Sequence, residues 1–141
     1  QIQQFAKDLG TNAGALDAER EALGKALENV QGIVGFMAGA AFQSDPRTGG
    51  DLRNLYKVAQ NTTRLLLGAG DLVVGWLLLR QAEVALTALE SGANPKDEAF
   101  YQGKVAAARF FTRQVLPRLA AERAMAEATD NSLMDVPEAA F

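Results

Sequence analysis

The chain has 141 residues, a formal net charge of −3, 48% apolar residues, and neither cysteine nor histidine. The two missing residue types exclude disulfides, thiol nucleophiles, zinc sites of the usual kind and any acid–base relay that depends on histidine. Because the charges are spread along the chain and form no basic stripe, we expect no nucleic-acid partner.

The first element in chain order is a short helical segment, residues 1–9. Its apolar side chains recur at helical spacing, and a glycine then interrupts the pattern, so that Thr11 or Asn12 can cap the next helix. Gln1 is not an initiator methionine, and the residues after it form no signal-peptide core. We therefore interpret residues 1–9 as the end of an upstream helix in a longer protein.

Three longer helical segments follow. Residues 16–42 carry apolar side chains at spacings of three, four and seven, which is one face of a helix. A loop rich in Pro and Gly ends this segment, and Asp51 can cap a second helix that reaches residue 90. The last segment, residues 95–129, contains Pro117, which removes a backbone donor and predicts a kink just before it rather than a break.

The connections between these segments are short, which places consecutive helices side by side. Alanine and leucine dominate the apolar residues, which favours helices over strands. The sequence predicts an all-α fold, an up-and-down bundle of three long helices plus a short amino-terminal helix. Residues 1–141 form one helical domain in this interpretation, with residues 130–141 as an irregular tail.

The most apolar stretch, residues 65–79, lies between Arg64 and Arg80. A membrane-spanning helix needs about 20 apolar residues, and an ionised aspartate at its centre, here Asp71, costs about 3 kcal/mol on insertion scales. We interpret the stretch as a helix that is buried on most sides, and we expect no membrane span. A domain lying in the membrane interface is an alternative that uses the same run.

Asp71 needs a partner, because a carboxylate in so apolar a run must be paired, hydrogen-bonded or protonated. Our hypothesis is that the last helix supplies Arg109 or Arg113. A solvated Asp71 on a narrow polar strip is the alternative. Nearby, Gly68, Ala69, Gly70 and Gly75 give the helix a smooth strip on which a neighbouring backbone can pack, or on which a ligand can lie.

Trp76 and the adjacent Phe110 and Phe111 are the aromatic residues of interest. We interpret them as core or inter-domain packing, because stacking platforms for nucleotides come with basic companions. Two adjacent phenylalanines cannot both face one core. One of them is therefore a candidate for a face that docks on the rest of the parent protein, together with Phe36, Phe42 or Phe141.

Three runs in the second half carry a family pattern. They read Gly75–Ala82 (GWLLLRQA), Phe100–Lys104 (FYQGK) and Ala108–Pro117 (ARFFTRQVLP). These runs resemble the extra carboxy-terminal domain of a branch of the acyl-CoA dehydrogenases, and Ser132–Asp135 and Phe141 are similar to the way those proteins end. The branch includes dehydrogenases for fatty acyl-CoA and for 3-(methylthio)propanoyl-CoA.

The resemblance implies a bacterial parent enzyme that holds FAD and oxidises an acyl-CoA thioester to the trans-2-enoyl-CoA. It also implies electron-transferring flavoprotein as the electron acceptor, and as further partners the upstream dehydrogenase domains and a homo-oligomer. The catalytic glutamate of such enzymes lies in a Tyr-Glu-Gly-Thr type segment, which these 141 residues lack. No catalytic role is therefore assigned to Glu28, Glu83 or Glu90, and we expect the segment alone to be inactive and to bind neither FAD nor a metal.

The resulting expectation is a non-catalytic carboxy-terminal helical domain with a structural or interface role. It covers part of the dehydrogenase body, holds the dimer or borders the entrance for CoA. The alternative is a free-standing helical bundle that binds an apolar ligand or a partner helix near Gly68 to Gly70. The absence of cysteine fits a reducing compartment, so cytoplasm is the default location.

Overall fold

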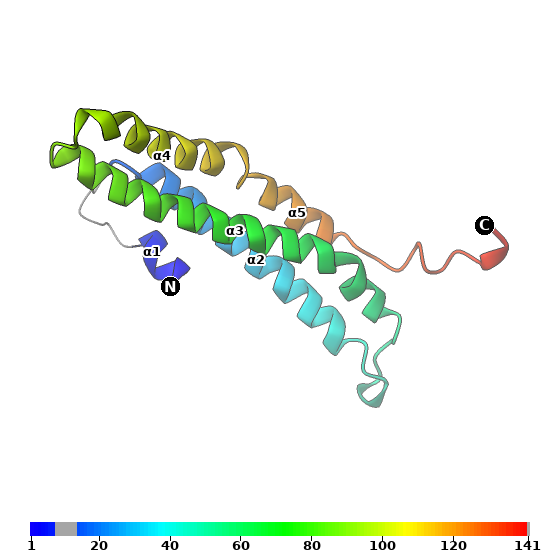
Figure 1. Cartoon of the computed structure of the whole chain (residues 1–141). Helices are drawn as coiled ribbons and strands as arrows, with labels where there is room; N and C mark the ends of the chain where they lie inside the picture. Colours follow the sequence, from blue (N-terminus) through cyan, green and yellow to red (C-terminus); the bar gives the residue numbers. More distant parts are fainter. Residues whose placement is uncertain (8–13, 141) are drawn as a thin grey trace.

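Five α-helices make up the chain in the computed structural model, which describes residues 1–7 and 14–140. They are α1 (Ile2–Lys7), α2 (Asp17–Phe42), α3 (Asn54–Glu90), α4 (Pro95–Gln114) and α5 (Arg118–Glu127), with two 3₁₀ turns at Pro46–Thr48 and Glu138–Ala140. Helix α3 runs antiparallel to α2, and α4 and α5 return in succession along α3 (Figure 1). The described residues contain no strand, and the predicted up-and-down bundle of three long helical segments with a short amino-terminal helix is confirmed.

Most helix boundaries fall close to those predicted. Helix α2 begins one residue after the predicted start and ends at the predicted residue, whereas the expected caps Thr11 and Asn12 lie outside the described residues. The loop after α2 turns at Gly49, which has a φ of +80° that favours glycine. At Gly50, an added Cβ would lie 2.4 Å from the carbonyl oxygen of Gln43, so the turn also needs a glycine there.

Helix α3 begins three residues later than predicted. The Asp51 carboxylate accepts a hydrogen bond from the Arg53 backbone N–H at 3.0 Å, and the Asn54 N–H donates to the Asp51 carbonyl at 2.9 Å. These bonds close a turn over residues 51–53 before the regular helix starts. Asp51 therefore supports the entry to α3 without being its N-cap residue.

The predicted kink in the last helix is a break. Helix α4 ends at Gln114 and α5 begins at Arg118. The N–H groups of Val115 and Leu116 both donate to the Phe111 carbonyl, at 2.9 and 3.2 Å, so the final turn widens. Pro117 has no N–H to donate to the hydrogen bonds of α4, and its fixed φ suits the beginning of a new helix. The apolar periodic pattern therefore spans two helices where one bent helix was expected.

The core lies along the line where the three long segments meet. Its buried side chains come from every long segment: Leu23, Ala26, Val30, Leu72, Leu79, Ala82, Val105, Ala108, Leu116 and Leu119. The glycines of α3 shape this contact. An added Cβ at Gly68 would lie 3.0 Å from the side chain of Leu119, and one at Gly75 would lie 3.1 Å from that of Leu116. The small residues thus let the region of the α4–α5 break pack closely on α3.

Candidate functional site

Asp71 is paired, as expected, but with a different arginine from the two predicted. Its Oδ2 accepts a hydrogen bond from Arg118 Nη2 at 2.8 Å, across the contact between α3 and α5. Arg109 and Arg113 lie on α4 and contact another carboxylate. The partner prediction was wrong because the break before α5 changes which side chains of the last segment face Asp71.

Glu19, at the start of α2, is the carboxylate that Arg109 and Arg113 contact. Its side chain is buried, Arg113 Nη2 donates to its Oε1 at 2.8 Å, and Arg109 Nε lies 3.9 Å from the same oxygen. Arg109 also donates through Nη2 to the carbonyl of Ala15 at 3.2 Å. Two arginines of α4 therefore hold the first turn of α2 and the residues before it.

A second buried charge pair joins α2 to α3. Arg20 is 5% exposed, and its Nη2 forms an ion pair with Glu83. Together with the neighbouring Glu19, this pair places charged side chains inside one end of the bundle. Charges taken out of water must be matched closely, so these contacts specify how the three long segments align.

A third polar contact ties α3 to α5 and to Thr129 just after it, near the other end of the bundle, and sequence reasoning missed it. The buried Asn61 side chain donates to the Lys57 carbonyl at 2.9 Å and to Thr129 Oγ1 at 3.1 Å. Its Oδ1 accepts from Arg64 Nε at 3.0 Å, and Arg64 also pairs with Glu122. The only sequence signal was an asparagine at a core position of the helical repeat.

The glycine strip serves helix packing, not ligand approach. Gly68 and Gly75 are covered by leucine side chains, as described above. Gly70 is exposed, and an added Cβ there would meet no atom within 4 Å. The hollow that remains beside Gly68 is small, about 100 Å³, and charged side chains such as Arg64, Asp71 and Glu122 line it, which does not favour an apolar ligand.

The three predicted aromatic residues occupy different environments. Trp76 and Phe111 are half-buried and pack against the core, whereas Phe110 is 65% exposed. Phe42 is also exposed, but it lies 23 residues beyond Glu19 on α2, about 35 Å along the helix axis. Arg113, three residues after Phe110 on α4, contacts Glu19 at the start of α2. Phe110 therefore lies near the opposite end of α2 from Phe42, and the two do not form one patch.

A cluster of exposed apolar side chains lies instead on the side of α3 that faces away from the bundle. We call it the outer face of α3, and its members are Leu66, Leu67, Val73, Val74, Leu77 and Val84. Their spacings follow the helical repeat and place them opposite the buried Gly68, Leu72, Gly75 and Leu79. The apolar run at residues 65–79 signalled burial on most sides, but the bundle covers one side.

The outer face of α3 continues into a groove shared with α4, of about 420 Å³. Its apolar lining includes Leu77, Val84 and Phe100, and Phe100 packs edge-to-face on Tyr101 with ring centroids 5.6 Å apart. Lys104 Nζ lies 5.2 Å from the Phe100 ring centroid and donates to Gln81 Oε1 at 3.0 Å. The groove therefore combines an apolar floor with cationic side chains at its rim.

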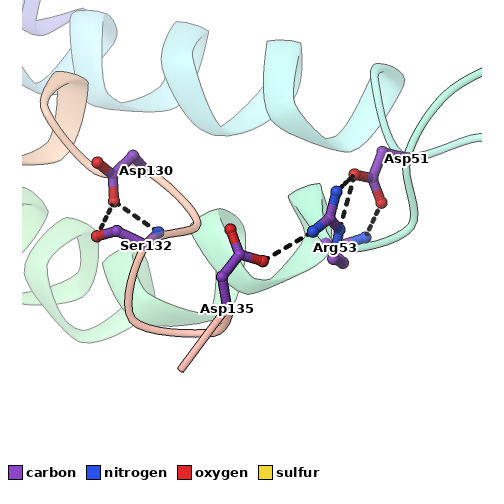
Figure 2. Close-up of polar contacts among 5 residues, drawn as sticks. All are labelled: Asp51, Arg53, Asp130, Ser132 and Asp135. Carbon is purple, nitrogen blue, oxygen red and sulfur yellow. Dashed lines mark hydrogen bonds and ion pairs between the residues drawn. The ribbon is translucent and has the colours of Figure 1, made fainter. Parts of the chain in front are cut away.

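The carboxy-terminal tail is held against the start of α3 (Figure 2). Arg53 Nη1 contacts Asp135 Oδ1 at 2.7 Å, while its Nη2 contacts Asp51 Oδ2 at 2.6 Å. Hydrogen bonds from the Arg53 side chain hold the pKa of Asp51 below its ordinary value. A hydrogen bond from the Ser132 hydroxyl, 2.6 Å long, likewise lowers the pKa of Asp130 at the start of the tail.

Replacing Arg53 with Gln is expected to release the tail while the helices stay intact, because only the Arg53 guanidinium bridges Asp51 and Asp135. Nuclear magnetic resonance should show shifted amide signals for Met134 and Asp135, with unchanged far-ultraviolet circular dichroism. The control is Arg47→Gln, since Arg47 pairs with Asp45 inside the loop before α3. Unchanged tail signals in Arg53→Gln would show that the tail holds its position without this bridge.

The contact between Asp51 and Arg53 depends on pH through the pKa of Asp51. A carboxylate with a lowered pKa in the folded form stabilises this contact above its ordinary pKa of 3.8, and the contribution is lost as the pH falls through the lowered value. The amide signal of Arg53, which donates to Asp51, should therefore be the same at pH 7 and pH 5 and should move below about pH 4. An unchanged Arg53 amide signal at pH 2 would contradict this assignment.

No group of three or more Asp or Glu side chains in the described part of the chain is placed to hold a metal ion. The carboxylates with clearly lowered pKa values are at least partly exposed and are held by partners close in sequence, as Glu21 is by Lys25. Among the described helices, α3 alone is long and apolar enough to cross a membrane by length and composition, with 28% of its most apolar window buried in the bundle.

Comparison with known proteins adds the family context. Residues 1–137 match the family model described as "acetyl-CoA dehydrogenase C-terminal like". The whole chain aligns at 44% identity with the broad-specificity linear acyl-CoA dehydrogenase FadE5 of Mycobacterium tuberculosis, and the alignment covers 22% of the length of that protein. A second alignment, of 80 residues, has 39% identity with a butyryl-CoA dehydrogenase of Syntrophomonas wolfei. It covers 56% of this chain and 13% of that protein. The chain thus spans about a fifth or less of the length of these relatives.

Proposed function

Because the chain belongs to the acetyl-CoA dehydrogenase C-terminal-like family, we propose that it is the non-catalytic helical domain of a longer FAD-dependent acyl-CoA dehydrogenase. The observation that carries this proposal is the alignment with the Mycobacterium tuberculosis dehydrogenase. It has 44% identity, and it covers this whole chain but only 22% of the length of that enzyme. The domain resembles one small part of an enzyme, and most of that enzyme lies elsewhere. Its role in the proposal is architectural.

The residues support a non-catalytic role. The sequence has no histidine or cysteine, and its most buried carboxylate, Glu19, is held between two arginines. Glu83 is paired with the buried Arg20. A base that removes the α-proton of an acyl-CoA needs a free carboxylate at an open substrate site, and neither of these two provides one.

The acyl-CoA dehydrogenase family is FAD-dependent, and in the proposed parent the flavin accepts the β-hydride of the substrate. The residues described here do not fit a flavin site. Gly68 and Gly75, the two α3 glycines that face the bundle, are covered by the side chains of Leu119 and Leu116, and the sequence around the exposed Gly70 has no phosphate-binding loop pattern. We therefore place FAD, the catalytic glutamate and the conversion of acyl-CoA to trans-2-enoyl-CoA in the rest of the polypeptide.

The partners and location in this proposal follow from the same parent enzyme. The domain contacts the upstream dehydrogenase domains, the enzyme is a homo-oligomer, and electron-transferring flavoprotein accepts its electrons. We propose a cytoplasmic enzyme with no membrane span and no nucleic-acid partner. Against a spanning α3 stand the ion pairs of Asp71 with Arg118 and of Arg64 with Glu122, which would have to enter the membrane with the helix.

The test is the visible spectrum of the full-length polypeptide that contains this domain, recorded without oxygen before and after addition of butyryl-CoA and of a long-chain acyl-CoA. Flavin absorption is expected and should bleach with at least one of the two, because hydride transfer reduces the flavin. The 141-residue chain alone should be colourless. A full-length protein without flavin, or one that neither acyl-CoA bleaches, would contradict the proposal.

A further inference from the structure

We propose that the outer face of α3 is the surface by which this domain docks on the dehydrogenase body that precedes it in the same polypeptide. The inference rests on the proposed function and adds to it the surface and its occupant. It begins from an imbalance in α3. One side of this 37-residue helix is filled by α2, α4 and α5, while the opposite side carries the exposed apolar side chains of the outer face in its middle section.

The outer face runs along much of α3. From Leu66 to Val84 it covers about 27 Å of the helix axis, and the side chains at both ends remain more than two thirds exposed. From Leu66 to Leu77 it carries no charged side chain, because Asp71 points toward α5 and pairs with Arg118, and the exposed Arg80 then lies beside it before Val84. Scattered exposed leucines are normal on a soluble protein, but an uncharged cluster such as Leu66–Leu77 marks a binding surface.

The occupant is argued from the length of chain outside this domain. The relative from Mycobacterium tuberculosis matches this chain over 22% of its length, which leaves 78% for other parts of the protein. A covalently attached partner has an effective concentration in the millimolar range when the linker is short. The dehydrogenase body therefore competes for the outer face of α3 at an advantage over a second copy of the domain.

The rim of the outer face gives the chemistry of the complementary surface. Arg80 and Lys104 border the groove at Leu77 and Phe100. An apolar anchor flanked by carboxylates on the dehydrogenase body fits this arrangement, since apolar contacts at the centre and charge pairs at the rim are the usual anatomy of an interface. A lipid surface fits less well, because membrane-surface helices carry a basic polar face and this chain has a net charge of −3.

The test uses the full-length polypeptide with the photo-reactive residue p-benzoylphenylalanine at Leu66 or Leu77, and at Ala106 as the control. Ala106 is exposed and lies on the side of α4 that faces away from α3. After irradiation, the attached peptide is identified by mass spectrometry in a mixture of light and heavy isotope-labelled chains. Attachment from Leu66 and Leu77 to upstream residues of the same chain is expected, at least tenfold above that from Ala106.

Three outcomes would overturn the inference. They are attachment to any segment of a second chain, attachment no greater than at Ala106, and attachment to lipid when vesicles of phosphatidylcholine and phosphatidylglycerol are present. Circular dichroism and flavin content of each substituted protein establish that it is folded. The flavin spectrum separates the two proposals, because a protein that bleaches with acyl-CoA but shows no attachment at Leu66 and Leu77 refutes the docking surface alone.

Discussion

Replacing Glu83 with Ala is expected to destabilise the 141-residue chain by about 3–5 kcal/mol, because it leaves the charge of Arg20 buried without its carboxylate partner. Arg20 is 5% exposed and cannot regain full hydration without opening the contact between α2 and α3. Urea unfolding followed by circular dichroism measures this loss. The fluorescence of Trp76, the one tryptophan in the sequence, provides a second probe of the same transition.

The double variant Arg20→Met with Glu83→Leu separates the cost of an unpaired charge from the value of the pair. Apolar residues of similar volume remove both charges, so its stability should return to that of the unchanged chain or exceed it. Glu21→Ala is the matched control, because Glu21 directly follows Arg20 on α2 but forms an exposed pair with Lys25, and little change is expected. A Glu83→Ala variant as stable as Glu21→Ala would show that water reaches Arg20.

Gly75→Val should destabilise the chain by about 1–3 kcal/mol, because the site has no room for a side chain. An added Cβ would already lie 3.1 Å from the Leu116 side chain, which is itself buried. The valine methyl groups would push the α4–α5 break away from α3. The same urea experiment measures the effect, and a shift of Val115–Pro117 should appear in amide signals of that segment.

Gly70→Val is the control for Gly75→Val, since both glycines lie inside α3 and differ in their surroundings. Gly70 is exposed with open space around it, so the substitution should stabilise the chain by a few tenths of a kcal/mol through helix propensity alone. Equal effects of the two substitutions would mean that α4 and α5 do not pack closely on α3 at Gly75.

Helical periodicity predicted the bundle well because it depends on local spacing. The segment 16–42 shows this, since one apolar face over 26 residues leaves little choice of structure or boundaries. The start of α3 was less predictable. An aspartate can cap a helix directly or support a preceding turn with the same carboxylate, as Asp51 does with Arg53, and both arrangements have the same sequence signature.

The contacts of the candidate site were harder to predict because they depend on the relative positions of different helices. A charge in an apolar run indicated that Asp71 has a partner, but the break at Pro117 places Arg118 there and directs Arg109 and Arg113 to Glu19. The burial of Arg20 had no signal in the sequence, since its neighbours Glu19 and Glu21 are charged too and such a run is typical of a solvated helix face. The apolar run at residues 65–79 indicated burial on most sides. The exposed outer face could not be predicted from it, because the sequence does not say how many sides of α3 the other helices cover.

The length of α3 also bears on how the protein is made. Ribosomes release a polypeptide from its amino end, and domains fold in that order. In a polypeptide whose dehydrogenase body comes first, the body can fold before the 37 residues of α3 emerge. The apolar outer face then meets a finished surface within the time needed to complete α4 and α5. In that arrangement, the domain order limits the interval in which nascent chains can aggregate through this helix.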